Sequence, residues 1–271
     1  MSDAEYTTIA AARADGVTTV TLNRPQIRNA FDETMIAELT ACAVGAASGG
    51  CRALVFRAAG PVFCAGADLN WMKRAAAYSH EQNLDDACLL ERMFAAIAAF
   101  PGVTIAIVHG AALGGGAGLV AACDVAIADV ETKFALSEVR LGLVPAVVAP
   151  YILQRVTPGA ARALFVTGER IDAAAAMRIG LVNYVTAGEQ EREERLGALL
   201  ESVIASGPAA IGTAKRLLRG LIGMRPDEAA AITTACIADL RAGDEAREGI
   251  AAFLEKRKPR WAGAPRAQDL P

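Results

Sequence analysis

The segment Ala112-Leu113-Gly114-Gly115-Gly116-Ala117-Gly118 decides the fold of this chain. It follows the apolar run 103–108 and opens an Ala- and Val-rich stretch that ends at residues 123–124, a pattern that predicts a strand, a glycine turn and a buried helix. The first N–H groups of a helix have no acceptor within the helix and carry the positive end of its dipole. Such a turn can bind a phosphate, or a carbonyl oxygen that gains negative charge during a reaction. Close packing of the helix against the strand explains an isolated glycine run equally well.

A second loop of small residues comes earlier in the chain, at residues 61–69. It follows a strand-like run at 53–57 and offers further exposed amides, and Asp68 stands where the N-cap of a short helix belongs. A third segment, 134–145, places Glu138 among apolar neighbours. Loss of water around this carboxylate would raise its pKa toward the range that a general acid or base needs.

These three segments, in this order, resemble the enoyl-CoA hydratase/isomerase (crotonase) family. The resemblance runs from the turn Thr21-Leu22-Asn23-Arg24-Pro25 to the ending Phe253-Leu254-Glu255-Lys256-Arg257, and so covers nearly the whole chain. It implies an α/β core of β-β-α superhelical turns and a C-terminal helical region that forms trimers, commonly paired as a hexamer. We therefore expect a crotonase-like, acyl-CoA-binding core over residues 1–195 and a helical oligomerisation region over 196–271.

The periodicity of the sequence by itself predicts an α/β region followed by helices. Thr- and Val-rich runs flank Asp15-Gly16, which is a strong β-hairpin signal. Helix and strand patterns then alternate to about residue 185. Residues 74–83 are polar and weakly patterned, which predicts a surface loop or a mobile segment over the acyl pocket. Four stretches with helical periodicity follow, at 189–206, 209–221, 226–241 and 245–257.

Composition limits the class of protein. The 271-residue chain is 54% hydrophobic with a net charge of −3, whereas nucleic-acid binders usually display a basic face. Because the family includes an RNA-binding relative, an RNA-binding module is kept as a remote alternative. No stretch approaches the roughly 18 uninterrupted apolar residues of a membrane span, and the first residues lack the pattern of a secretory signal. We expect a cytoplasmic protein that binds neither nucleic acid nor membrane.

The resemblance assigns the chemistry to three residues. By match to the family's motifs, the amides of Ala67 and Gly115 would form an oxyanion hole for the enolate of an acyl-CoA thioester, and Glu138 would be the general acid/base. Enolate chemistry at a thioester is redox-neutral, so we expect no metal, flavin or nicotinamide. Substrate and CoA would contact Arg28, Ala30, Ala65, Gly66, Asp68, Leu69, Gly114, Gly118, Phe253 and Lys256.

Two of these assignments have ordinary alternatives. Arg28 is equally well explained as a solvated turn residue, and Lys256 as a charge that complements the C-terminal end of a helix dipole. Phe253 and Lys256 would reach the CoA of a neighbouring subunit, as the family's C-terminal helix does. We assign no chemistry to Cys64, because a nucleophilic thiol needs an activating base. His109 we expect to be a packed histidine with its hydrogen bonds satisfied.

The sequence departs from the common hydratase pattern at two places. Familiar hydratases carry two glutamates, and the position matching the first of them is Gly118 here. The glycine-rich loop that usually follows the proline is replaced by the apolar residues 146–151. Together these features look most like bacterial methylglutaconyl-CoA hydratases and their relatives. We therefore expect a hydratase of a branched enoyl-CoA, and the alternative is an enoyl-CoA isomerase that shuttles one proton with Glu138 alone.

Overall fold

An N-terminal β-hairpin starts the fold, in a computed structural model that describes residues 6–262. Asp15 and Gly16 both have positive φ, 51° and 74°, as a tight hairpin turn requires. The strands on either side, β1 (Ile9–Ala14) and β2 (Val17–Leu22), pair antiparallel. The predicted hairpin is therefore confirmed.

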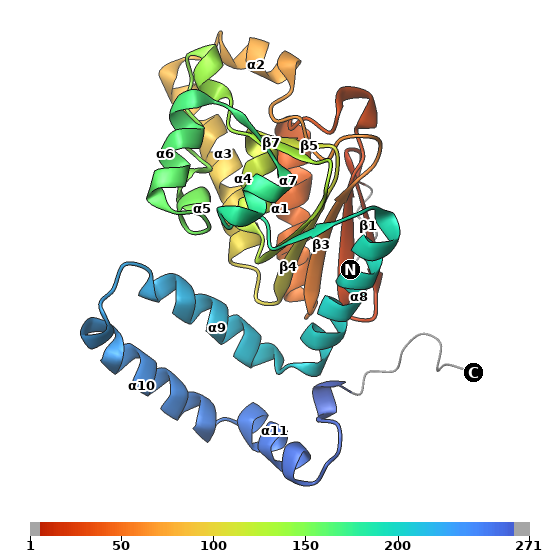
Figure 1. Cartoon of the computed structure of the whole chain (residues 1–271), viewed down its shortest axis with the longest axis vertical. Helices are drawn as coiled ribbons and strands as arrows, with labels where there is room; N and C mark the ends of the chain where they lie inside the picture. Colours follow the sequence, from red (N-terminus) through yellow and green to blue (C-terminus); the bar gives the residue numbers. More distant parts are fainter. Residues whose placement is uncertain (1–5, 263–271) are drawn as a thin grey trace.

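Parallel pairing extends the hairpin into a six-stranded sheet of order β1-β2-β3-β4-β6-β9. A second sheet has the order β5-β7-β8, and Figure 1 shows its strands β5 and β7 side by side. The added strands of the larger sheet are β3 (Ala53–Ala58), β4 (Val103–Val108), β6 (Val125–Asp129) and β9 (Tyr184–Thr186). Those of the smaller sheet are β5 (Ala111–Leu113), β7 (Lys133–Ala135) and β8 (Arg170–Asp172).

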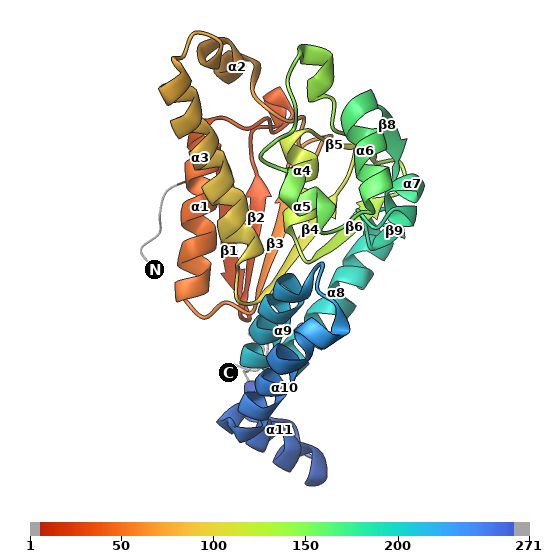
Figure 2. The ribbon, with the colours of Figure 1, turned by 90° about the vertical axis from the view of Figure 1, so that its left-hand side faces the viewer.

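Helices cover both faces of the larger sheet. Figure 2 shows α1 and α3 in front of the sheet, with α4 beside them. The core helices are α1 (Glu33–Ser48), α2 (Leu69–Ala75), α3 (His80–Ala98), α4 (Gly115–Ala122), α5 (Ala149–Leu153), α6 (Pro158–Thr167) and α7 (Ala173–Arg178). Helix α8 (Glu189–Ala205) packs on the opposite face, where Leu196 is buried against Val55 and Ile105. The α/β class is confirmed.

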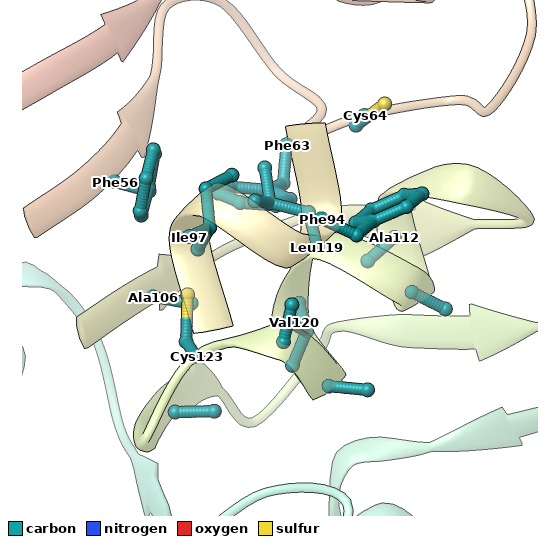
Figure 3. Close-up of a cluster of buried hydrophobic side chains, with 14 of the residues drawn as sticks. Phe56, Phe63, Cys64, Phe94, Ile97, Ala106, Ala112, Leu119, Val120 and Cys123 are labelled. Atoms are coloured by element: carbon teal, nitrogen blue, oxygen red, sulfur yellow. The ribbon is translucent and has the colours of Figure 1, made fainter. Parts of the chain in front are cut away.

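Aromatic and aliphatic side chains fill the space between α3, α4 and the sheet (Figure 3). Phe94 of α3 and Leu119 of α4 are both fully buried there, together with Phe63 from the loop that follows β3. Burying an aromatic or leucine side chain stabilises a fold by roughly 1.5–3 kcal/mol, so this cluster fixes α4 against its neighbours. The glycine turn at the start of α4 is held by the same packing.

The prediction of a loop over residues 74–83 is largely wrong. Helix α2 continues to Ala75 and α3 already begins at His80. Ser79 caps α3 in a capping box with Gln82, so the polar residues that looked unstructured are the start of a helix. Only residues 76–79 connect the two helices.

The C-terminal helices lie away from the sheets (Figures 1 and 2). They are α9 (Pro208–Leu221), α10 (Pro226–Ala242) and α11 (Asp244–Leu254), so the stretch predicted for the last helix ends three residues early. Lys215 ties α9 to the core, because its ammonium group donates to the carbonyls of Phe100 and Gly102 at 2.7 and 2.8 Å. The predicted division between residues 195 and 196 falls within α8 and remains a prediction.

Three short 3-10 segments complete the fold, η1 (Pro25–Ile27), η2 (Glu138–Leu141) and η3 (Arg260–Ala262). Within residues 6–262, no single helix has the length and apolar composition of a membrane span. Helices α8 and α9 meet these criteria only as a pair bent by 104°.

Candidate functional site

The glycine turn joins β5 to α4 and has a conformation that only glycine adopts easily. Gly114 has φ 50° and ψ −120°, and its N–H donates to the carbonyl of Ala135 at 2.8 Å. Gly115 is the first residue of α4. Its N–H donates to no acceptor within residues 6–262, as expected for the first turn of a helix.

The loop after β3 runs along the segment before α1. The N–H of Phe31 donates to the carbonyl of Gly66 at 2.7 Å, and the N–H of Asp68 donates to the carbonyl of Phe31 at 2.8 Å. These two bonds make a short parallel bridge between Phe31 and Ala67. The N–H of Ala67 lies between them and donates to no acceptor in the described chain, and Ala67 is exposed.

The two loops approach each other so closely that larger residues would not fit. A Cβ at Gly66 would lie 3.1 Å from the carbonyl oxygen of Leu113, and a Cβ at Gly116 would lie 2.7 Å from that of Cys64. The N–H of Leu113 donates to the Cys64 carbonyl at 2.9 Å. The structure thus brings the segments of Ala67 and Gly115 together, as the sequence predicts.

Glu138 lies beside this turn, at the start of η2. A Cβ at Gly114 would be 2.7 Å from its Oε1 atom. Its Oε2 atom is buried and has no hydrogen-bond partner among the described residues. Burial raises the pKa of the Glu138 carboxyl above its ordinary value. A carboxyl group with a raised pKa holds a proton more readily than an exposed one, which favours a role as general acid or base.

Gly118 faces an apolar wall. A Cβ at this position would lie 2.2 Å from Cγ1 of Val148 and 3.2 Å from Cζ of Phe94. Val148 is buried and immediately precedes α5. The space beside Gly118 that a second carboxylate would occupy is therefore filled by Val148.

The turn predicted to hold CoA adjoins the site. Arg28 and Asn29 both have positive φ, and the carbonyl of Arg28 accepts from the N–H of Ala65 at 3.0 Å. Asn29 is buried, and its side-chain amide donates to the carbonyls of Ala59 and Val62 at 2.8 Å. Ala30 is buried, whereas the Arg28 side chain is exposed. The turn and the loop 61–68 thus form one hydrogen-bonded unit.

Asp68 and Leu69, two other residues predicted to contact the substrate, differ in how available they are to a ligand. Both carboxylate oxygens of Asp68 are engaged by protein donors, which are the amides of Asn70 and Trp71 and the guanidinium of Arg24. A contact between Asp68 and CoA remains a prediction. Leu69 is 73% exposed at the start of α2 and is open to a ligand.

Helix α11 carries Phe253 and ends just before Lys256, and it lies away from α4 and the glycine turn of the same chain (Figure 1). Phe253 is 82% exposed, and Lys256 has φ 55° just after α11 ends. The structure does not bring these two residues to the site within one chain. Their role at a neighbour's site remains a prediction.

Cys64 and His109 have the structural roles expected of them. Burial raises the pKa of the Cys64 thiol to about 12, which leaves it a thiol at neutral pH. His109 Nε2 lies 2.7 Å from the carbonyl oxygen of Gly60. Within residues 6–262, no group of three or more His, Cys, Asp or Glu side chains could hold a metal ion.

Two residues at the site were not assigned a role from sequence. Arg24 belongs to the turn Asn23-Arg24-Pro25. Its ion pairs with Asp32 and Asp68 depend on how distant segments fold together, and the turn sequence does not predict them. The contact of Val148 with Gly118 joins residues thirty positions apart, and no local pattern signals it.

Comparisons with known proteins show which family the chain resembles. Residues 12–264 match the model of a family described as enoyl-CoA hydratase/isomerase. The mouse protein named enoyl-CoA hydratase domain-containing protein 2, mitochondrial, is 36% identical over 259 residues, which is 92% of this chain and 85% of that protein.

Solved structures resemble the whole chain. An enoyl-CoA hydratase from Shewanella pealeana has a TM-score of 0.91 at 36% identity, covering 96% of this chain and 97% of its own. Pseudomonas aeruginosa AtuE has a TM-score of 0.90 at 36% identity, covering 94% of this chain and all of its own. The crotonase-like fold with a helical C-terminal region is confirmed by these similarities.

Proposed function

This chain belongs to the enoyl-CoA hydratase/isomerase family, and on that premise we propose that it stabilises an acyl-CoA enolate with Ala67 and Gly115 while Glu138 moves the proton. The observation that carries the proposal is the Glu138 carboxylate beside the glycine turn, whose buried Oε2 atom has no hydrogen-bond partner in the part of the chain that the structure describes. A general base needs a lone pair that no other donor occupies, and Oε2 accepts no hydrogen bond from residues 6–262.

The proposed enolate lies against main-chain donors. When a proton leaves or joins the carbon next to the thioester carbonyl, negative charge collects on the carbonyl oxygen. The free N–H groups of Ala67 and Gly115 can bind that oxygen, and the dipole of α4 adds to the effect at Gly115. Removing one donor of this kind typically lowers turnover by ~10²–10³.

The favoured reaction is hydration of a branched enoyl-CoA of the methylglutaconyl type. Apolar side chains support it, because Leu143 and Val144 are exposed just after η2 and would contact a branched acyl group. The distal carboxylate of such a substrate needs a cation. Arg74 already pairs with Glu33 through both carboxylate oxygens, which leaves the exposed Lys73 on α2 as the candidate.

Isomerisation is the second candidate, and the Val148 contact favours it. With Val148 filling the space beside Gly118, no second carboxylate stands there to hold water, and one-base transfer of a proton needs none. Mass spectrometry of the products from a panel of enoyl-CoA thioesters distinguishes the two reactions, since hydration adds the mass of water and double-bond migration adds none. A hydrated branched product supports the favoured reaction. Migration without hydration supports the alternative.

Assembly into a homotrimer or hexamer is part of the proposal. Large apolar side chains are exposed along the C-terminal helices, among them Leu218, Ile237, Ile250 and Phe253. A groove of about 930 Å³ lies between α9, α10 and α11. A second copy of this chain would cover such surfaces and bring Phe253 and Lys256 to its CoA. Sedimentation of the full chain as a stable monomer would contradict this part.

We also expect the protein to work without a redox cofactor or a metal ion, and in the cytoplasm. The absence of a redox cofactor or metal follows from the proposed chemistry and is tested by activity of metal-free protein. A cytoplasmic location is likewise a proposal, and the mouse relative carries the word mitochondrial in its name.

A further inference from the structure

One guanidinium group joins the two segments that form the Phe31–Ala67 bridge. Arg24 Nη1 lies 2.8 Å from Asp32 Oδ2, and its Nη2 lies 3.1 Å from Asp68 Oδ2. Nη1 also donates to the carbonyl of Ala30 at 2.9 Å. The three charged side chains are 18%, 17% and 8% exposed, respectively, so water screens them only partly.

Both carboxylates also cap helices with their second oxygen. Asp32 Oδ1 accepts from the N–H of Met35 at the start of α1, and Asp68 Oδ1 accepts from the N–H of Asn70 at the start of α2. Arg24 thereby fixes the first turns of two helices relative to each other. The planar guanidinium suits this task, because its donors point in set directions.

The consequence falls on Ala67, which directly precedes Asp68. Two backbone bonds to Phe31 hold the segment 66–68, and Phe31 directly precedes Asp32. The Arg24 ion pairs thus hold together, through side chains, the same two segments that the backbone bridge joins. A displacement of this segment would move the free N–H of Ala67 away from the position where the carbonyl oxygen of a substrate gains charge.

We propose that Arg24 is a positioning residue for the Ala67 amide, an inference that rests on the proposed enolate chemistry. Arg24 acts through Asp68 and Asp32 and does not itself bind the reacting atoms. Small errors in the placement of a donor cost far more in binding an enolate than in binding a neutral thioester, because the charged oxygen depends on short, aligned hydrogen bonds.

The test compares two thioesters that differ in charge. Acetoacetyl-CoA loses a proton to give an enolate that absorbs in the near ultraviolet, whereas butyryl-CoA does not ionise at neutral pH. Full-length wild type, Arg24→Lys and Arg24→Met are titrated with both. Arg57→Met is the matched control, because Arg57 also forms an ion pair, with Glu193 of α8, on the other side of the sheet.

We expect Arg24→Met to bind the enolate at least about tenfold more weakly while its affinity for butyryl-CoA changes less than twofold. Arg24→Lys keeps the positive charge but lacks the planar guanidinium group, so its affinity for the enolate should fall by a smaller factor. Arg57→Met should match wild type. If Arg24→Met does not fold, the lysine variant carries the same comparison.

Two results would overturn the inference. Equal losses for both thioesters in the Arg24 variants would show a general effect on binding or folding, and an unchanged enolate signal would show that Arg24 does not place the amide. A wild-type protein that binds acetoacetyl-CoA without any enolate absorbance would instead refute the proposed function, and the inference with it.

Discussion

The carboxylate of Glu138 occupies the place where a side chain at Gly114 would begin, with Oε1 2.7 Å from the position of a Cβ. Two independent features therefore require glycine at position 114. Its φ of 50° and ψ of −120° need glycine, and so does the approach of the catalytic carboxylate proposed here.

Replacing Glu138 with glutamine should lower turnover by at least ~10² while the protein stays folded, because general acid-base groups typically contribute that much. Glutamine keeps the size of the side chain but cannot accept the proton. Steady-state kinetics of Glu138→Gln measure the effect, and the exposed Glu131→Gln variant is the control. Turnover like that of wild type in Glu138→Gln would refute the role given to this residue.

The same carboxyl group should make both activity and stability depend on pH. Burial raises its pKa above the ordinary value of 4.5, so kcat/KM should fall as the pH drops through that raised pKa and the base becomes protonated. For stability the sign is opposite. The folded state binds the proton more tightly than the unfolded state, so the contribution of Glu138 is most favourable below the unfolded pKa and is lost as the pH rises through the folded pKa.

Thermal unfolding at pH 8 checks this second effect. Glu138→Gln should melt at the same temperature as wild type or higher, because it removes a buried charge. A clearly lower melting temperature would mean that the ionised carboxylate has a stabilising partner.

Proline at position 67 should lower activity strongly and cost less stability than a proline that breaks a backbone hydrogen bond. Within residues 6–262 the Ala67 N–H donates to no acceptor, so Ala67→Pro removes the proposed oxyanion donor without breaking a backbone hydrogen bond, at an expected cost of ~10²–10³ in turnover. Ala65→Pro is the matched control, because the Ala65 N–H bonds to the Arg28 carbonyl at 3.0 Å. Thermal melting should fall more in the control. Full activity in Ala67→Pro would show that this amide is not the donor.

Adding one methyl group at Gly118 should destabilise the fold. Alanine is favoured over glycine in helices by about 1 kcal/mol, but its Cβ would lie 2.2 Å from Val148 Cγ1, and overpacking of this kind costs about 1–3 kcal/mol. Urea denaturation should show a loss in Gly118→Ala and none in Gly159→Ala, which has open space on α6. The double variant Gly118→Ala/Val148→Ala should be more stable than the sum of the single effects predicts.

Much of the fold follows from local signals in the sequence. Asp15-Gly16 predicts its hairpin because two residues with positive φ suit few other structures, and the glycine run predicts the start of α4 for a similar reason. The prediction of a loop at residues 74–83 is largely wrong because a capping box is made of the same polar residues as a loop.

The candidate site divides in the same way. The segments holding Ala67, Gly115 and Glu138 could be found from sequence because each lies in a local motif. The Arg24 ion pairs and the Val148 wall could not, since they depend on contacts between residues far apart in the chain. Phe253 and Lys256 raise a different difficulty, because they are predicted to complete the CoA site of a neighbouring subunit and a single chain cannot test that contact.

The free main-chain amides of Ala67 and Gly115 have a genetic consequence. An amino-acid substitution at either position changes the side chain and leaves the N–H in place, unless the new residue is proline. Damaging mutations should therefore concentrate in the neighbouring residues that shape the site, such as Gly66, where a side chain would meet Leu113, and Gly114, where it would meet Glu138. A library of variants at the residues facing the acyl group can thus be screened for new substrates, because every variant keeps the two amides proposed to bind the thioester oxygen.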